Sequence, residues 1–218
     1  MILASQTTCA LNGYLAEVRQ TIYQGLRYDT TKVLSEICGY SKARVSAEEL
    51  SKETYLSTEN MLPGKGGFEN ATAIPSSGQV PAFAIGDTLV SNIRPYFKKI
   101  VYANQAGGCS GDVLRFHPKN QSLSAFLFCT LFSDQFFEYM LAGAKGTKMP
   151  RGDKQQIMNY PVRTLSMSAL TDFNNSAIPI LKQQRTLIAQ NIRLAELRDT
   201  LLPKLMSGEI SVDQLAAK

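Results

Sequence analysis

The pattern of apolar residues first predicts a short amphipathic helix near the start of the chain. Leu15, Val18, Ile22 and Leu26 recur at three- and four-residue intervals, with polar residues between them. This spacing puts the apolar side chains on one face and predicts a helix over residues 12–26. A helix this short is marginal alone, so we expect it to pack on another element.

A much longer helical pattern lies near the end of the chain. Apolar residues repeat every seven positions in two neighbouring stripes, which predicts one helix from about Asp172 to Leu202. Thirty helical residues extend about 45 Å, so this helix should project from the domain or pair with another helix. Pro179 lies inside it and predicts a kink or a separate first segment. The residues expected to pair with a partner helix are Leu181, Leu187, Ile188, Asn191, Leu194 and Leu201.

Between the two helices the pattern changes to short runs separated by Gly and Pro. From Lys32 to about Thr164 most runs are alternating and β-branched, as is typical of strands. Residues 123–142 differ, because a continuous apolar and aromatic face predicts one buried helix. The expected fold class is α/β (α+β), a globular domain with mixed or antiparallel strands and a long C-terminal helix. We divide the chain into an N-terminal helix (1–30), the domain (31–165), and the long helix with a C-terminal tail (166–218).

Basic residues are concentrated in the middle of the chain, although the net charge is only +5. Residues 81–164 contain 10 Lys or Arg against 5 Asp or Glu, whereas residues 1–80 contain 7 against 8. A local basic surplus is expected of a surface that binds anions, and nucleic acid first. A solvated basic face without a partner explains the same charge.

Motifs of common enzyme and metal sites are missing from the sequence. Neither GxxxxGK[ST] nor GxGxxG is present, and SNIRPYF lacks the second proline of an amino-methyltransferase tetrapeptide. The only histidine, His117, has no GxSxG elbow or cysteine partner to suggest catalysis. Asp87 and Asp112 each follow a glycine and are interpreted as turn residues. We therefore predict a binding protein without catalytic residues, metal or cofactor.

The location of the protein is predicted from what its termini and cysteines lack. The first residues have no charged region followed by a long apolar region, so no signal peptide is expected. No apolar run reaches the length needed to span a bilayer. The four cysteines are scattered without CxxC spacing, and metal ligation is not expected. These features predict a reduced, cytoplasmic protein without a membrane partner.

Four stretches of the chain resemble the specificity (S) subunit of type I restriction–modification systems. They are RVSAEELSKETYLSTENMLPGKGGF (44–68), GDTLVSNIRPYFKKIVYA (86–103), GTKMPRGDKQQIMNYPV (146–162) and QQRTLIAQNIRLAELRDTLLPKLMSGEI (183–210). The second and fourth are the more specific, and together the four cover most of residues 32–212 in order. The usual subunit has two recognition domains and two long helices, whereas this chain has one of each.

The resemblance implies a DNA-binding protein without catalysis of its own. A target-recognition domain would read one half of a split target in double-stranded DNA. The long helix would pair as an antiparallel coiled coil and dock a modification (methyltransferase) subunit, with a restriction and translocase subunit in the full complex. A chain of half size would have to form a homodimer through that helix, and a fragment of a longer product is the other reading.

The resemblance, together with the basic segments, predicts which side chains contact DNA. At the strand–turn–strand of residues 86–103, Arg94 would read a guanine and Asn92 an adenine, or both would hold the turn. Tyr96 and Phe97 are interpreted as packing residues. The segment GAKGTKMPRGDK is the densest basic stretch and the strongest candidate. The predicted contacts are Lys42, Arg44, Lys65, Asn92, Arg94, Lys98, Lys99, Lys145, Thr147, Lys148, Arg151 and Lys154.

Two alternatives remain at this stage. The chain could be the recognition part of a restriction–methylation fusion enzyme, which upstream methyltransferase motifs would reveal. It could also be a coiled-coil scaffold whose basic loops are incidental, which would leave duplex DNA unbound at low salt.

Overall fold

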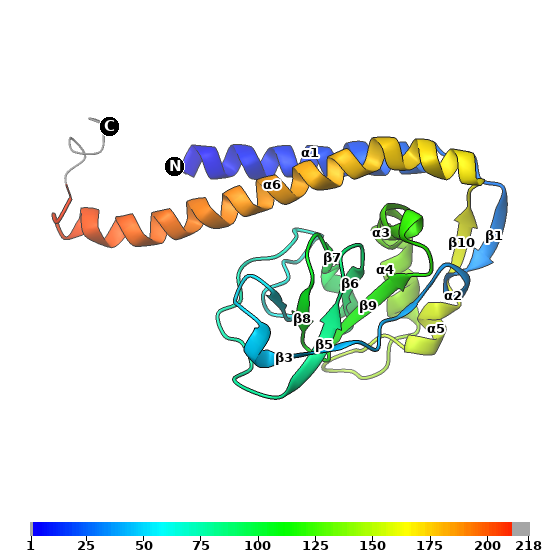
Figure 1. Cartoon of the computed structure of the whole chain (residues 1–218), viewed down its shortest axis with the longest axis horizontal. Coiled ribbons are helices and arrows are strands. Elements are labelled where there is room, and N and C mark those ends of the chain that lie inside the picture. Colours follow the sequence, from blue (N-terminus) through cyan, green and yellow to red (C-terminus); the bar gives the residue numbers. More distant parts are fainter. Residues whose placement is uncertain (1, 211–218) are drawn as a thin grey trace.

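Two long helices lie side by side, and a globular domain lies along one half of the length of this pair (Figure 1). The structure is a computed structural model that describes residues 2–210. Residues 211–218, which the sequence analysis grouped with the long helix, lie outside the described residues. The architecture confirms the predicted class of a mixed domain with a long C-terminal helix.

The elements follow one another with short connections. The helices are α1 (Ile2–Gln24), α2 (Leu34–Ile37), α3 (Ser124–Leu131), α4 (Asp134–Ala142), α5 (Lys154–Met158) and α6 (Met167–Met206). The strands are β1 (Thr30–Val33), β2 (Cys38–Tyr40), β3 (Arg44–Ser46), β4 (Tyr55–Leu56), β5 (Gln79–Phe83), β6 (Thr88–Ser91), β7 (Ile100–Tyr102), β8 (Gly107–Cys109), β9 (Val113–Pro118) and β10 (Pro161–Thr164). None of these helices is long and apolar enough to cross a membrane, as far as residues 2–210 show.

The long helix α6 packs antiparallel against α1 of the same chain. Thr8 donates a hydrogen bond to Asn191, and further along the pair Arg19 donates to Gln184. The predicted helix over residues 12–26 therefore begins ten residues earlier, and it supplies the partner that the long helix was expected to need. The last turns of α6 extend past the start of α1 (Figure 1).

The burial of α6 explains how one helix serves two neighbours. Its buried residues are spaced three or four apart, as expected for one helix face: Leu170, Phe173, Ala177, Leu181, Gln184 and Leu187. Beyond Leu187 the same face is only partly buried, because α6 leaves the main core. One contact with the domain continues there: the Asn70 side-chain amide donates to the Glu196 carboxylate at 2.9 Å. Pro179 is exposed and does not break the helix, so the predicted separate first segment is wrong.

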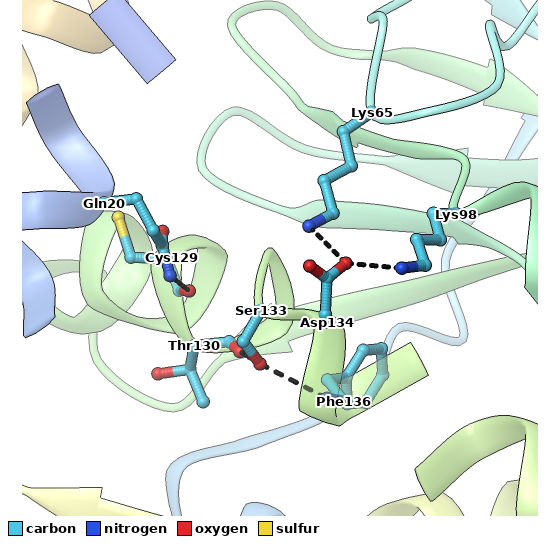
Figure 2. A network of polar contacts seen from close by, with 8 residues as sticks. All are labelled: Gln20, Lys65, Lys98, Cys129, Thr130, Ser133, Asp134 and Phe136. Carbon is cyan, nitrogen blue, oxygen red and sulfur yellow. Dashed lines mark hydrogen bonds and ion pairs between the residues drawn. The ribbon is translucent and has the colours of Figure 1, made fainter. Parts of the chain in front are cut away.

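Arg19 ties α1 to both the domain and α6. Its side chain is 1% exposed, and its guanidinium lies over the rings of Phe128 and Phe132, 4.7 and 4.6 Å from their centroids. The Gln20 amide next to it donates to the carbonyl of Cys129 at 3.3 Å (Figure 2). Burial lowers the pKa of Arg19, because no carboxylate compensates the desolvated charge. The stacked rings and the Gln184 carbonyl take that place.

A two-stranded neck joins the domain to the helix pair. Strands β1 and β10 are antiparallel, with Thr30 opposite Thr164 and Val33 opposite Pro161. The chain therefore enters and leaves the domain at adjacent points, directly after α1 and directly before α6. The domain is an insertion between two helices that pack together.

The domain is built from two four-stranded sheets. The first has the order β2-β9-β6-β7 and is antiparallel throughout. The second has the order β3-β5-β8-β4, in which β4 and β8 are parallel. The main core lies on one face of the first sheet, where α3, α4 and α6 contribute buried aromatic residues such as Phe126, Phe136 and Phe173. The second sheet encloses a smaller core around Met61 and Leu89.

The helix predicted over residues 123–142 is two helices. Helix α3 ends at Leu131, and α4 begins at Asp134 after Ser133, whose side chain accepts a hydrogen bond from the Phe136 amide at 3.2 Å (Figure 2). This N-cap allows the chain to turn between the helices. Every residue of α3 is buried, whereas α4 buries only one face.

Candidate nucleic-acid interface

The turn between β6 and β7, residues 92–99, is called the corner. A short 3-10 helix over Pro95–Phe97 forms its tip, flanked by Arg94 and Lys98, which both have a φ of 50°. The left-handed backbone at these two residues turns the chain within a few positions. Tyr96 and Phe97, interpreted as packing residues, are 48% and 40% exposed, with ring centroids 4.7 Å apart. An exposed aromatic pair beside basic residues is a surface on which a base or sugar can pack.

Asn92 lies at the root of the corner. Its backbone amide donates to the Asp112 carbonyl at 2.8 Å, and its backbone carbonyl accepts from the Gly152 amide at 3.2 Å. Its side-chain Oδ1 is buried and has no hydrogen-bond partner in the described part of the chain. Because the residue is only 7% exposed, the structure favours the alternative role, that of holding the turn, and the adenine contact stays a prediction. Arg94 shares this role in part, because its amide donates to Pro150 at 2.8 Å and its Nε is buried.

The glycine loop, residues 62–67, packs against the corner. Gly64 and Lys65 donate backbone hydrogen bonds to Phe97 and Lys98 at 2.8 and 2.9 Å. The sequence analysis named Lys65 and Lys98 separately, and the structure brings them together. The Cβ that an alanine would add at Gly67 lies 3.4 Å from Ile188 of α6, so this loop also reaches the helix pair.

Asp134 holds the two lysines of these loops. Lys98 and Lys65 both reach the same oxygen, Oδ1, at 2.6 and 2.9 Å (Figure 2). Hydrogen bonds from Lys98 and Lys65 lower the pKa of Asp134, so the carboxylate remains charged below its ordinary range. The Lys65 ammonium also lies 5.0 Å from the centre of the Phe132 ring. The sequence analysis missed Asp134; Ser133 before it signals a helix start, but not the approach of two lysines.

Lys99 is held in a similar way without a carboxylate. Its ammonium donates to the Thr58 carbonyl at 2.5 Å and lies 5.9 Å from the centre of the Phe97 ring. Burial lowers the pKa of Lys99. Lys65, Lys98 and Lys99, three of the lysines predicted to contact DNA, therefore already have partners within the protein.

The basic loop, residues 143–154, is more open. Lys145 and Arg151 face each other across a bridge and exchange two backbone hydrogen bonds of 2.9 Å, so the tip between them forms a tight turn. Thr147 and Lys148 at this tip are exposed. Lys145 pairs with Asp153 at 2.8 Å and Arg151 with Asp112 at 3.2 Å, yet both remain more than half exposed. Lys154, at the start of α5, is exposed.

The basic loop and the corner form one unit. Ile93 and Arg151 are bridge partners, and the Arg94 and Gly152 amides complete the connection. A Cβ at Gly152 would lie 2.8 Å from Met140, 2.9 Å from Ile157 and 3.0 Å from Asn92, so only glycine fits without rearrangement. The basic loop, the most basic segment of the sequence, is therefore anchored on the corner.

Lys42 lies between β2 and β3, and Arg44 is the first residue of β3. Arg44 donates to the Gln79 carbonyl at 2.6 Å across β3 and β5, which fixes the guanidinium along the strand pair. Lys42 is exposed in the connection from β2 to β3. The hydroxyl of Tyr40 in β2 donates to the Lys154 carbonyl at 3.1 Å, which links this connection to the end of the basic loop. Across residues 2–210, no three His, Cys, Asp or Glu side chains are grouped to hold a metal ion.

Comparison with known proteins relates this fold to that of type I S subunits. The S subunit of a type I restriction–modification system from M. genitalium has a TM-score of 0.59 at 15% identity, over 92% of this chain and 55% of that one. The HsdS subunit from Thermoanaerobacter tengcongensis has a TM-score of 0.47 at 15% identity, over 94% and 54%. The chain thus spans about half the length of these proteins. No family model and no curated protein matches the sequence.

Proposed function

We propose that this chain is a DNA-recognition (specificity) subunit of a type I restriction–modification enzyme, without catalysis of its own. The observation that supports this most is the fold likeness to the M. genitalium S subunit over nearly the whole chain. The basic loop, exposed at the surface of the domain, is the part suited to contact the phosphates of duplex DNA. The Tyr96 and Phe97 pair at the adjoining corner is suited to contact the sugars or bases between them.

We propose further that two copies act together and read the two halves of one target. The 40 residues of α6 extend about 60 Å, long enough to separate two domains along DNA. Its overhang beyond α1 has the exposed apolar residues Leu197, Leu202 and Met206, the last 82% exposed. Of the predicted pairing residues, Leu181 and Leu187 are buried within this chain, and Asn191 contacts Thr8 and Cys9 of α1, so the proposed contact between copies moves to this end. A modification subunit would dock on the same helix pair.

The test of the proposal is target selection from random duplexes, with the chain alone and with a modification subunit. An inverted repeat with an unread spacer of fixed length is expected. No binding of any duplex at low salt, with or without the subunit, would leave the scaffold alternative as the better account.

A seven-residue insertion directly after Leu197 tests whether the length of α6 determines the spacer without changing the half-site sequence. It lengthens each α6 by about 10.5 Å without entering the part covered by α1. The spacer should lengthen, on the order of 3 base pairs per helix at 3.4 Å each, and the half-sites should stay the same. A changed half-site sequence with an unchanged spacer would contradict the role of the helix.

A further inference from the structure

A groove formed by residues of β2, β5 and β9 and the segments next to them contains the only histidine of the chain. Residues 39–43 and residues 82–84 form its walls, and its open space measures about 480 Å³. His117 and Lys119, in β9 and directly after it, line the groove together with Lys42. The Arg115 guanidinium below joins the walls by donating to the carbonyls of Ala43 and Ala82, both at 3.0 Å.

A buried carboxylate fixes the orientation of His117. Asp87 is 0% exposed, and its Oδ1 lies 2.6 Å from Nδ1 of His117. Its other oxygen accepts a hydrogen bond from the Ala84 amide at 2.9 Å, so both carboxylate oxygens are occupied. Because a carboxylate only accepts, Nδ1 of the ring donates, and Nε2 is the ring atom left for a ligand. The imidazole is half exposed, at 51%, although the residue behind it is fully buried.

The surroundings of His117 favour an anion. Neither Lys42 nor Lys119 forms an ion pair with any residue in the described part of the chain. The lining residues include no carboxylate, since Asp87 lies behind the ring and its oxygens are taken. Two ammonium groups and an imidazole that is held from behind are groups that bind a phosphate.

We propose that this groove binds a backbone phosphate of duplex DNA through Nε2 of His117 and the ammonium groups of Lys42 and Lys119. The inference rests on the proposed function and adds two contact residues, His117 and Lys119, to it. Tyr40, one of the lining residues, donates from its hydroxyl to the carbonyl of Lys154 at the end of the basic loop, which connects the groove to that loop. A phosphate oxygen accepts hydrogen bonds, so Nε2 is the donor in this contact.

The single histidine allows a direct test in the intact chain. The imidazole resonances of chain labelled at histidine are followed by NMR while a short duplex is added at low salt, and binding is followed in parallel by fluorescence anisotropy. We expect the His117 resonances to move over the same concentration range as the anisotropy. His117→Gln, which removes the imidazole, should weaken duplex binding.

A double variant separates the groove from the rest of the interface. Lys42→Ala with Lys119→Ala should lower the slope of log K against log salt by about 2, since each phosphate contact contributes about 0.9. The matched control is Lys32→Ala with Lys182→Ala, which removes the same charge from exposed positions outside the groove and should change the slope little.

The outcomes distinguish the groove from the proposed function. If the duplex binds while the His117 resonances stay in place and both double variants give the same slope, the groove inference is overturned and the proposed function stands. If the duplex does not bind at all, the proposed function fails with it. Inorganic phosphate is added in a separate arm; resonances that move with it but not with duplex would assign the groove to small phosphate compounds and overturn the DNA contact.

Discussion

The basic loop and the corner are both rich in cations, yet they offer them to a partner very differently. At the corner and its glycine loop, Lys65 and Lys98 converge on Asp134, and Lys99 donates to a carbonyl. In the basic loop, Lys148 and Lys154 are exposed and form no ion pair within residues 2–210. An internal partner must be given up before such a lysine can bind a phosphate. The number of positive charges in a segment is therefore a poor guide to how strongly it binds DNA.

The largest effect is expected from removing the exposed lysines of the basic loop. Substituting Lys145, Lys148 and Lys154 by alanine should weaken duplex binding on the order of 100-fold at low salt and lower the salt slope by about 3. Alanines at Lys32, Lys52 and Lys182 remove the same charge elsewhere and serve as the control. A loss of equal size in both triple variants would show that total charge, and not the basic loop, determines binding.

The next largest effect concerns Gly152, at which the basic loop packs against the corner. Gly152→Ala should lower the free energy of unfolding by about 1–3 kcal/mol, because the added methyl group meets Met140, Ile157 and Asn92. Gly111→Ala is the matched control, since no atom lies within 4 Å of its added Cβ. Thermal and urea unfolding would measure the difference. Equal stability of the two variants would mean that the basic loop is not anchored on the corner as described.

The smallest effect should have the opposite sign. Asp134→Asn removes the shared partner of Lys65 and Lys98 while keeping the shape of the side chain. The two lysines then become available, and we expect duplex affinity to rise by about 3-fold, because exposed ion pairs contribute about 0.2–1 kcal/mol. Asp172→Asn, on the exposed side of α6, is the control. Weaker binding by Asp134→Asn would show that the carboxylate orients the lysines for DNA.

The pH dependence of the same contact follows from the lowered pKa of Asp134. A carboxyl group with a lowered folded-state pKa stabilises the protein above its unfolded pKa, and this contribution is lost as the pH falls through the folded value. Asp134→Asn should therefore narrow the difference in stability between neutral and acidic pH. Urea unfolding of both proteins at the two pH values would measure it.

Helical periodicity predicted the helices well where one face is strongly apolar. The long helix was predicted from its two apolar stripes. Its observed bounds differ from the predicted ones at the two ends, where capping residues determine where a helix begins and stops. Residues 2–11 of α1 were missed because they contain Ser, Thr and Gln between few large apolar residues. Thr8 and Cys9 contact Asn191 of α6, and such a contact between distant positions is not recorded in the local sequence. The break at Ser133 was missed because the apolar pattern continues through it.

The residue types of the candidate site could be predicted from the sequence, but which of these side chains are free to bind DNA could not. The basic loop and the corner stand out in the sequence through their composition. Whether a lysine is free to bind DNA depends on contacts between positions that are far apart in the sequence. Asp134, for example, is 36 residues from Lys98 and 69 from Lys65. Likewise, Asp87 was interpreted as a turn residue, which it is, but His117 comes to it through the pairing of β6 with β9. Pairing across a sheet is the information that a single sequence lacks.

The helix pair also determines how two copies could be joined artificially. Helix α1 begins and helix α6 ends toward the same side of the molecule, away from the neck (Figure 1). A flexible linker from the end of α6 in one copy to the start of α1 in the next would therefore need to span only this end of the helix pair, not the width of a domain. Such a tandem polypeptide would allow one domain to be altered while the other keeps its native residues. Each half of a recognised sequence could then be assigned to an individual domain.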